Sequence, residues 1–512
     1  MFSDIKLLDC TLRDGGYYTN WNFDDDVVDD YISAMNKLPI DYIELGYRNN
    51  PHSEYLGKFA YTPKSVLSHI KKLSDKRLVL MINDKDTEPK DVPTLLQPIC
   101  DLVDMIRIAT APEKILHALK LAEEIKKLGL KVSLNVMYMS TWLKNPDFMS
   151  NLKYLDGVVD LLCMVDSFGG IFPDDLKKIV SVVKENTSCT LGFHGHNNLQ
   201  MGLINAVTAV ECGVDCIDST ISGMGRGAGN LSTELLLTYL SENGLDVNLN
   251  VVGEVVSLFN PLLEKYQWGT NLPYMISGAY SIPQKDVMSW VSNRAYSFNS
   301  IVRALDNKRT NKKDNAKFPL FVANENVKNV LIIGGGTSVK EHLNAIKEYI
   351  KKYNSVLIFA TCRWVSHFQD CDNEKYYVLV GNEAKRMKQN ISKETFVGKC
   401  ILSSYPRLMG TEVPDFAMDK TFEIDKVTFT DKYLDSCTTV SLQIALMLSA
   451  QEINIIGYDG YLGGVLSEKE AKLTMENRTI ITDFVKNTNK DIVSLSETLY
   501  NELTVKSIYQ FL

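Results

Sequence analysis

The sequence lacks the features that mark secreted, membrane-spanning and nucleic-acid-binding proteins. Its ten cysteines include no C-x-x-C pair, and no Cys or His cluster joins Cys212 and Cys216, so we expect reduced, mostly buried thiols and no zinc site. No uninterrupted apolar run approaches the length of a membrane span. The net charge of −8 disfavours nucleic acid as a partner. Asp4 and Lys6 interrupt the first apolar run, so no secretory signal is expected, and the protein is expected in the cytoplasm.

Length and composition are those of a soluble globular protein with more than one hydrophobic core. The chain has 512 residues, of which 45% are hydrophobic and 23% are charged. A single core of ordinary size does not extend over this length, so at least two domains are expected. The predicted linker is 303–326, which begins with a stretch rich in Asn, Lys, Arg and Asp.

Residues 1–302 carry a repeating pattern of apolar and amphipathic segments. Short apolar segments recur at 5–8, 42–45, 78–82, 105–108, 131–136, 158–165, 190–193 and 216–217. Amphipathic segments such as 112–128 and 174–184 lie between them. Eight strand–helix units in roughly 240 residues predict an α/β fold, a TIM (β/α)8 barrel, with a helical extension up to residue 302.

Polar side chains gather where these predicted strands end. They are Arg13 and Asp14 after the first, Glu44 in the second, Arg107 in the fourth, Asn135 in the fifth, Ser167 after the sixth, and His194 and His196 in the seventh. Barrel enzymes assemble their sites at this end of the strands. The convergence predicts a catalytic role for Glu44 and substrate contacts for Arg107, Asn135 and Ser167. The alternative for Glu44 is a hydrogen-bonded carboxylate at the rim of the barrel, and the alternative for the other three is packing within the barrel or support of the residues that touch substrate.

The two histidines and Asp14 form a candidate metal set. Residues two apart in a strand face the same side, so His194 and His196 can point both imidazoles at one ion. With Asp14 they make a two-histidine, one-carboxylate set that suits a divalent ion and leaves positions open for substrate. Arg13 and Asp14 are followed by Gly15 and Gly16, which predict a flexible turn. A structural Arg–Asp ion pair and hydrogen-bonded core histidines are the alternatives.

Three segments together carry a resemblance to a known family: 11–15 (TLRDG), 194–197 (HGHN) and 225–230 (GRGAGN). They resemble the DRE-TIM metallolyases, the superfamily of 4-hydroxy-2-oxovalerate aldolase, HMG-CoA lyase and isopropylmalate synthase. The segments 165–169 and 268–274 are most similar to its oxo-acid aldolase branch. The resemblance implies that Asp14, His194 and His196 bind Mn²⁺ or Mg²⁺, with Asn230 as a further ligand, and that Arg13 stabilises an enolate oxygen.

The implied activity is cleavage or formation of a 4-hydroxy-2-oxo acid through a pyruvate-type enolate. Its partners would be a small 2-oxo acid and an aldehyde. The metal would polarise the carbonyl, and the guanidinium of Arg13 would offset the developing negative charge. As in the aldolases resembled, the helices after the barrel are expected to close the site or to pair subunits in a homo-oligomer.

The general base departs from the family pattern. The bacterial aldolases resembled here commonly have a histidine three residues after the metal-binding aspartate, where this sequence has Tyr17, followed by Tyr18. A phenol is a poor base at its ordinary pKa of about 10, although a nearby metal and arginine would lower that pKa. A metal-bound hydroxide, His52 or an inert Tyr17 are alternatives. The departure also leaves open Claisen-type acyl-CoA chemistry, or a metal-binding regulatory protein without turnover.

Residues 327–512 predict a second, Rossmann-like domain that binds a nucleotide. An apolar strand at 327–333 ends in Gly334, Gly335, Gly336, Thr337 and Ser338, before a helix at 339–352 and a strand at 356–360. Backbone N–H groups of such a turn can hold phosphate. The third glycine of the dinucleotide fingerprint and the Walker lysine are missing, which disfavours NAD and P-loop chemistry. The alternative is a glycine turn that packs a helix on a sheet.

A second segment of this domain extends the pattern. A strand at 452–456 runs into Gly457, Tyr458 and Asp459. With the glycine turn it resembles the Rossmann-type domains of family 42 sialyltransferases and motility-associated glycosyltransferase-like proteins. The resemblance implies a nucleotide or nucleotide-sugar site that includes Asp459. Fused to an aldolase-like barrel, it indicates a role in surface-sugar biosynthesis.

Overall fold

The computed structural model describes residues 4–293, 296–312, 316–323, 326–407, 409, 412–461 and 466–512. The chain forms two compact units, Met1–Met288 and Ser289–Leu512. The predicted domain boundary after residue 302 falls inside helix α14 (Phe298–Arg309), which lies in the second unit.

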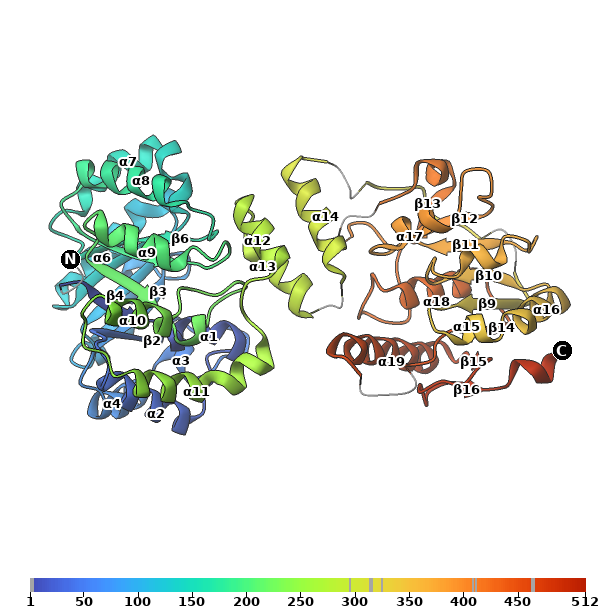
Figure 1. The fold of residues 1–512 in the computed structure, drawn as a ribbon, viewed down its shortest axis with the longest axis horizontal. Coiled ribbons are helices and arrows are strands. Elements are labelled where there is room, and N and C mark those ends of the chain that lie inside the picture. Colours follow the sequence, from blue (N-terminus) through green and yellow to red (C-terminus); the bar gives the residue numbers. More distant parts are fainter. Residues whose placement is uncertain are drawn as a thin grey trace. The chain divides into compact units, whose positions relative to one another are not determined.

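The first unit is a closed barrel of eight parallel strands, as the sequence predicts (Figure 1). The strands are β1 (Lys6–Asp9), β2 (Tyr42–Tyr47), β3 (Arg77–Asn83), β4 (Met105–Thr110), β5 (Lys131–Val136), β6 (Leu161–Asp166), β7 (Thr190–Gly195) and β8 (Cys216–Ser219). Each coincides with one of the apolar segments. Helices cover the outer face of the barrel, so its strands are buried on both faces and read as continuous apolar runs.

Helices connect the strands and extend beyond the last one. They are α1 (Thr11–Thr19), α2 (Asp25–Asn36), α3 (Lys58–Tyr61), α4 (Lys64–Leu73), α5 (Val92–Leu96), α6 (Ile115–Lys127), α7 (Pro146–Asn151), α8 (Pro173–Asn186), α9 (Gly202–Glu211), α10 (Thr233–Glu242), α11 (Leu249–Tyr266), α12 (Leu272–Ala279) and α13 (Gln284–Met288). In α6 the buried positions Ile115, Ala118, Leu119, Ala122 and Ile125 recur at helical spacing, which holds that helix against the barrel.

The predicted flexible turn at Gly15 and Gly16 is wrong, because both residues lie inside α1. A Cβ on Gly16 would lie 2.1 Å from the Trp21 ring, and one on Gly15 would lie 2.4 Å from the sulfur of Met224. Close packing therefore requires these glycines, and Arg13 and Asp14 are held on the first turn of a helix.

The second unit has an eight-stranded sheet in the order β13-β12-β11-β10-β9-β14-β15-β16. The strands are β9 (Asn329–Ile333), β10 (Val356–Phe359), β11 (Lys375–Val378), β12 (Lys399–Leu402), β13 (Thr421–Glu423), β14 (Glu452–Ile456), β15 (Ile492–Ser494) and β16 (Thr504–Val505). Every strand pair in this sheet is parallel. The strand order reverses between β9 and β14, and ligands bind at such switch points in open α/β sheets.

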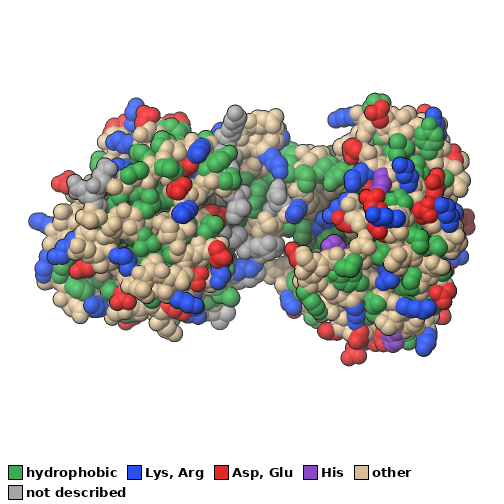
Figure 2. Space-filling model, turned by 180° about the vertical axis from the view of Figure 1, so that it is seen from behind, with side chains coloured by type: hydrophobic (Ala, Val, Ile, Leu, Met, Phe, Trp, Pro, Cys, Tyr) green, Lys and Arg blue, Asp and Glu red, His purple; other side chains and the backbone are tan. Residues whose placement is uncertain are grey.

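The helices of the second unit are α14, α15 (Ser338–Glu341), α16 (Leu343–Tyr353), α17 (Glu383–Asn390), α18 (Cys437–Met447) and α19 (Glu468–Thr488). The helix predicted at 339–352 is divided at His342 into α15 and α16. On the face of the molecule seen in Figure 2, basic and acidic side chains are interspersed. None of the helices in the described ranges combines the length and the apolarity needed to cross a bilayer, and all ten cysteines are free thiols.

Candidate active site

Asp14 lies at the carboxyl end of the barrel strands, where charged side chains surround it. Its Oδ1 forms a short contact with Nη1 of Arg13, and its Oδ2 accepts a hydrogen bond of 2.7 Å from Nδ2 of Asn230. Nε2 of His194 lies 3.7 Å from the same Oδ2. Burial alone would raise the pKa of Asp14, but Arg13, followed by His194 and His196, holds it below its ordinary value. Asp14 is therefore a carboxylate, the form that binds a cation.

Both histidines are oriented by a hydrogen bond at Nδ1. In His194 this nitrogen lies 3.0 Å from Oδ2 of Asp218, and in His196 it lies 2.7 Å from the backbone oxygen of Asp166. Metal-binding histidines usually engage a carboxylate or a carbonyl in this way, which leaves the other ring nitrogen for the ion. Burial, reinforced by His194, lowers the pKa of His196 to about 3, so this ring is neutral, as a ligand must be.

Asn230 supplies an independent sign that an ion fits here. Its Oδ1 is buried and has no hydrogen-bond partner, although its Nδ2 touches Asp14. An isolated bridge pairs the backbone of Asn230 with that of His196. A buried amide oxygen without a partner is costly, and a divalent cation beside Asp14 would satisfy it. The donor set of carboxylate, two imidazoles and amide oxygen suits a divalent cation.

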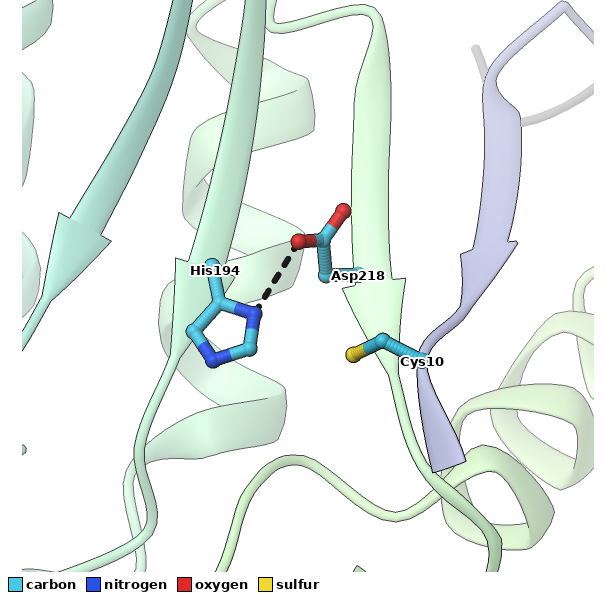
Figure 3. A group of neighbouring side chains, drawn as sticks. All are labelled: Cys10, His194 and Asp218. Atoms are coloured by element: carbon cyan, nitrogen blue, oxygen red, sulfur yellow. Dashed lines mark hydrogen bonds and ion pairs between the residues drawn. The ribbon is translucent and has the colours of Figure 1, made fainter. Parts of the chain in front are cut away.

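A second grouping of ligand atoms around His194 differs from the predicted one. One atom each of Cys10, His194 and Asp218 lie within 4.8 Å of one another, and Figure 3 shows these side chains on neighbouring segments of the barrel. Burial, with Asp14 nearby, raises the pKa of the Cys10 thiol well above its ordinary value, so the thiol stays protonated. Oδ2 of Asp218 is already engaged by His194 and by Nη2 of Arg107 at 2.6 Å. We therefore interpret Asp218 as the group that orients His194, and this trio as no metal site.

Arg13, Glu44 and Arg107 form one buried charge network. Oε2 of Glu44 accepts from Nε of Arg13 at 2.8 Å and from Nη1 of Arg107 at 3.4 Å. Burial opposes the ionisation of Asp218, but Arg107 and then His194 lower its pKa to about 2. Because Glu44 accepts a hydrogen bond from Arg13, it fixes the guanidinium of Arg13 beside Asp14. Direct catalysis by Glu44 stays a prediction.

The three predicted substrate contacts are engaged by the protein itself. Arg107 is fully buried, and its Nε donates to Oδ1 of Asn135 at 2.7 Å. Oγ of Ser167 accepts from the backbone nitrogen of Tyr138 at 2.8 Å. This arrangement favours packing within the barrel for Arg107 and Asn135, and contact of Arg107, Asn135 and Ser167 with substrate stays a prediction.

Tyr17 lies one helical turn after Asp14. Its neighbours Tyr47 and Arg226 were not predicted from the sequence. Its hydroxyl lies 2.8 Å from the hydroxyl of Tyr47 and accepts a hydrogen bond of 2.8 Å from Nη2 of Arg226. The guanidinium carbon of Arg226 also lies 3.7 Å from the centre of the Tyr17 ring. Arg226 stands inside the glycine-rich motif, so its position was visible in the sequence, but its partner on α1 was not.

In the second unit, the glycine turn and Asp459 line a cavity of about 1180 Å³ at the carboxyl ends of the strands. Asp459 accepts hydrogen bonds from the backbone nitrogen of Ser338 at 3.0 Å and from its hydroxyl. The carboxylate thus occupies the place at the start of α15 that the sequence offered to a phosphate. α15 spans only four residues, so it contributes little dipole.

Charged side chains on the cavity wall are mostly acidic. The carboxylates are Glu341, Glu383, Asp435, Asp459, Glu470, Glu476 and Glu497, and the cations are Arg363, Arg386 and Lys469. Arg363 is held over the turn by a bond of 2.9 Å from its Nη1 to the backbone oxygen of Gly335. A polyphosphate here would meet Arg363 and Arg386 but would also need a counter-cation.

Comparisons with known proteins agree with this geometry. The family model described as HMGL-like matches residues 4–254. An oxaloacetate decarboxylase of Mycobacterium tuberculosis is 28% identical over 46% of this chain and 70% of its own. A 4-hydroxy-2-oxovalerate aldolase of Chloroflexus aggregans is 29% identical over 48% of this chain and 72% of its own.

A solved structure resembles the first unit more closely. The N-terminal domain of a candidate aldolase from Bacteroides vulgatus is 59% identical to this chain, with a TM-score of 0.57. The match covers 59% of this chain and all of that domain. The barrel and the segment that follows it therefore recur together in a relative.

Proposed function

Because the N-terminal half of this chain belongs to the HMGL-like family of metal-dependent lyases, we propose that it is an aldolase that cleaves or forms a 4-hydroxy-2-oxo acid. The observation that carries the proposal is the group of Arg13, Asp14, His194 and His196 at one end of the barrel. Each histidine has its Nδ1 engaged by a protein acceptor, and Arg13 is fixed between Asp14 and Glu44.

The residues divide the work of the reaction. Asp14, His194, His196 and Asn230 would hold Mn²⁺ or Mg²⁺, which when bound polarises the 2-oxo group of the substrate. Arg13 presents a guanidinium to the oxygen on which enolate charge develops, and Glu44 keeps that guanidinium in place before the substrate arrives. Because its Nδ1 is engaged by Asp218, His194 need not reorient during turnover.

Enolate formation can be tested without knowing the aldehyde. We expect the protein to exchange the methyl protons of pyruvate in deuterated water, as followed by NMR, only when Mn²⁺ or Mg²⁺ is present. Arg13→Ala and His194→Ala should abolish the exchange. His69→Ala is the matched control, because His69 lies on the surface beside Asp29. No exchange by the metal-loaded protein would contradict the proposal, and dependence on a CoA thioester would favour acyl transfer instead.

A second activity follows from the same enolate. The Mycobacterium relative is named an oxaloacetate decarboxylase, and loss of CO₂ from oxaloacetate also leaves the enolate of pyruvate. We propose that this barrel decarboxylates oxaloacetate in the presence of metal. Pyruvate release, coupled to lactate dehydrogenase, would measure the reaction, and Arg13→Ala should slow it.

For the second unit, we propose that the cavity at the β9/β14 switch point binds a nucleotide or a nucleotide sugar, with Gly334–Ser338 and Asp459 forming its floor. The switch point supports this proposal, whereas the acidic wall predicts that Mg²⁺ must accompany the phosphates. Calorimetry of the full chain with UDP and CMP, with and without Mg²⁺, would test it. Absence of binding under both conditions would remove the link to surface-sugar biosynthesis.

A further inference from the structure

The proposed aldolase needs a general base, and the resembled aldolases commonly have a histidine for this role three residues after the metal-binding aspartate. Tyr17 takes that position on α1, and two groups lie within hydrogen-bonding distance of its oxygen. One is Nη2 of Arg226 at 2.8 Å, and the other is the hydroxyl of Tyr47 at 2.8 Å. Trp21 packs against the Tyr17 ring edge-on, with the ring centres 4.9 Å apart.

The two phenols have different surroundings, which decides which of them keeps its proton. Tyr47 is buried, with 3% of its surface exposed. Burial, followed by the neighbouring Tyr17, raises the pKa of Tyr47 well above its ordinary value. Tyr47 therefore stays protonated and can donate to Tyr17. The Tyr17 oxygen then accepts hydrogen bonds from a phenol and from a guanidinium, which hold this oxygen in one position.

The exposed side chain of Arg226 contacts Tyr17 rather than a carboxylate. The two buried arginines of the barrel form ion pairs with Asp14, Glu44 and Asp218. Within the described ranges, by contrast, no carboxylate lies within ion-pair distance of Arg226. The groups that act on Arg226 electrostatically are Tyr17, Tyr47, Asp14 and Arg13. Its guanidinium stacks on the Tyr17 ring and donates to the Tyr17 hydroxyl.

We propose that Tyr17 is the general base of the barrel and that Arg226 and Tyr47 are its positioning residues. The assignment rests on the proposed aldolase function. In cleavage, the Tyr17 phenolate takes the proton of the 4-hydroxyl, C4–O becomes a carbonyl, and the C3–C4 bond breaks. Its electron pair forms the enolate, whose oxygen faces Arg13. The enolate then takes a proton at C3 from water, and Tyr17 returns its own proton to water.

The first test needs no substrate. Ultraviolet difference titration of the wild type against Tyr17→Phe isolates the ionisation of Tyr17. The same difference, measured between Arg226→Gln and the Arg226→Gln, Tyr17→Phe double variant, should show ionisation at a higher pH, because the cation that donates to the Tyr17 oxygen is gone. Arg226→Lys should restore part of the shift. If Arg226→Gln leaves the ionisation unmoved, the assignment is overturned.

The second test compares two reactions of one site. Cleavage of 4-hydroxy-2-oxovalerate needs a base, whereas decarboxylation of oxaloacetate breaks a bond to a carboxylate and needs none. Tyr17→Phe should lower the ratio of cleavage to decarboxylation on the order of 100-fold, the usual contribution of a general base. The pH profile of cleavage in Arg226→Gln should move upward with the spectroscopic ionisation.

The control is Tyr42→Phe, since Tyr42 begins the strand that Tyr47 ends and lies at the opposite end of the barrel. An unchanged ratio in Tyr17→Phe would overturn the assignment even if both reactions proceed. If the wild type performs neither reaction and exchanges no pyruvate protons, the aldolase proposal itself fails. Mn²⁺ affinity, measured by calorimetry, should be retained in Tyr17→Phe, which separates loss of the base from loss of the fold.

Discussion

At the scale of single residues, His194 belongs to two candidate metal sites. One contains Asp14 and His196, and the other contains Cys10 and Asp218. Variants of the residues that the two sites do not share can show which of them binds metal. Cys10→Ser should leave Mn²⁺ affinity within about threefold, because a protonated thiol is no ligand for a hard ion. His196→Ala should weaken binding at least about 100-fold, because it removes a ligand. Calorimetric titration of both variants gives the comparison. The reverse pattern would make Cys10, His194 and Asp218 the metal site.

The lowered pKa of His196 also predicts how the stability of the protein depends on pH. In the fold its pKa is lowered to about 3, first by burial and then by His194, against an ordinary value of about 6.5. The unfolded chain therefore takes up a proton below pH 6.5, whereas the native state does not. Stability is complete above pH 6.5 and falls by about 1.4 kcal/mol per unit as the pH drops toward 3.

His196→Gln should remove this contribution. Between pH 7 and pH 5, the free energy of unfolding of the metal-free wild type should fall by roughly 2 kcal/mol more than that of the variant. Urea unfolding in a chelating buffer at both pH values measures the difference, and groups common to both proteins cancel. Parallel pH dependence in the two proteins would show that His196 is protonated in the fold.

At the scale of elements, helix α1 depends on a glycine that a helix would ordinarily disfavour. Gly16→Ala gains about 1 kcal/mol in helix propensity, but its Cβ would lie 2.1 Å from the Trp21 ring, and such overpacking costs about 1–3 kcal/mol. We expect a net loss of stability. Gly253→Ala is the matched control, since Gly253 lies inside α11 with nothing within 4 Å of its added Cβ.

The two glycine variants should therefore change the stability of the protein differently. The urea midpoint of the full chain, followed by circular dichroism, should fall for Gly16→Ala and should rise or stay unchanged for Gly253→Ala. A Gly16→Ala variant as stable as the control would mean that Trp21 can move away. In that case Trp21 would not fix the position of Tyr17.

The barrel strands and helix α1 show which parts of the fold could be predicted from the sequence. All eight barrel strands could be predicted, because a parallel strand covered on both faces needs a continuous apolar run. α1 could not, because Gly15 and Gly16 are a strong turn signal, and only their tertiary contacts with Met224 and Trp21 explain them. The partners of the candidate site were missed for a similar reason. The register that pairs Leu8 with Asp218, and the loop that carries Arg226 to α1, are properties of the closed barrel.

At the scale of the whole molecule, each of the two units should be stabilised against unfolding by its own ligand. Each unit has its own core and its own candidate site, so a ligand that binds one native unit stabilises that unit by mass action. At a concentration of 100 times its dissociation constant, the stabilisation is about 2.7 kcal/mol. The Mn²⁺ set lies entirely in the barrel unit, and the proposed nucleotide cavity lies entirely in the second.

Scanning calorimetry of the full chain should therefore resolve two transitions that respond independently. We expect Mn²⁺ or Mg²⁺ alone to raise the transition of the barrel by several degrees and to leave the other unchanged, whereas UDP added in the presence of Mg²⁺ should raise the second transition. His196→Ala should abolish the Mn²⁺ response without changing the response to nucleotide. A single transition that both ligands move together would instead mean that the units unfold as one, and each site would then stabilise the whole chain.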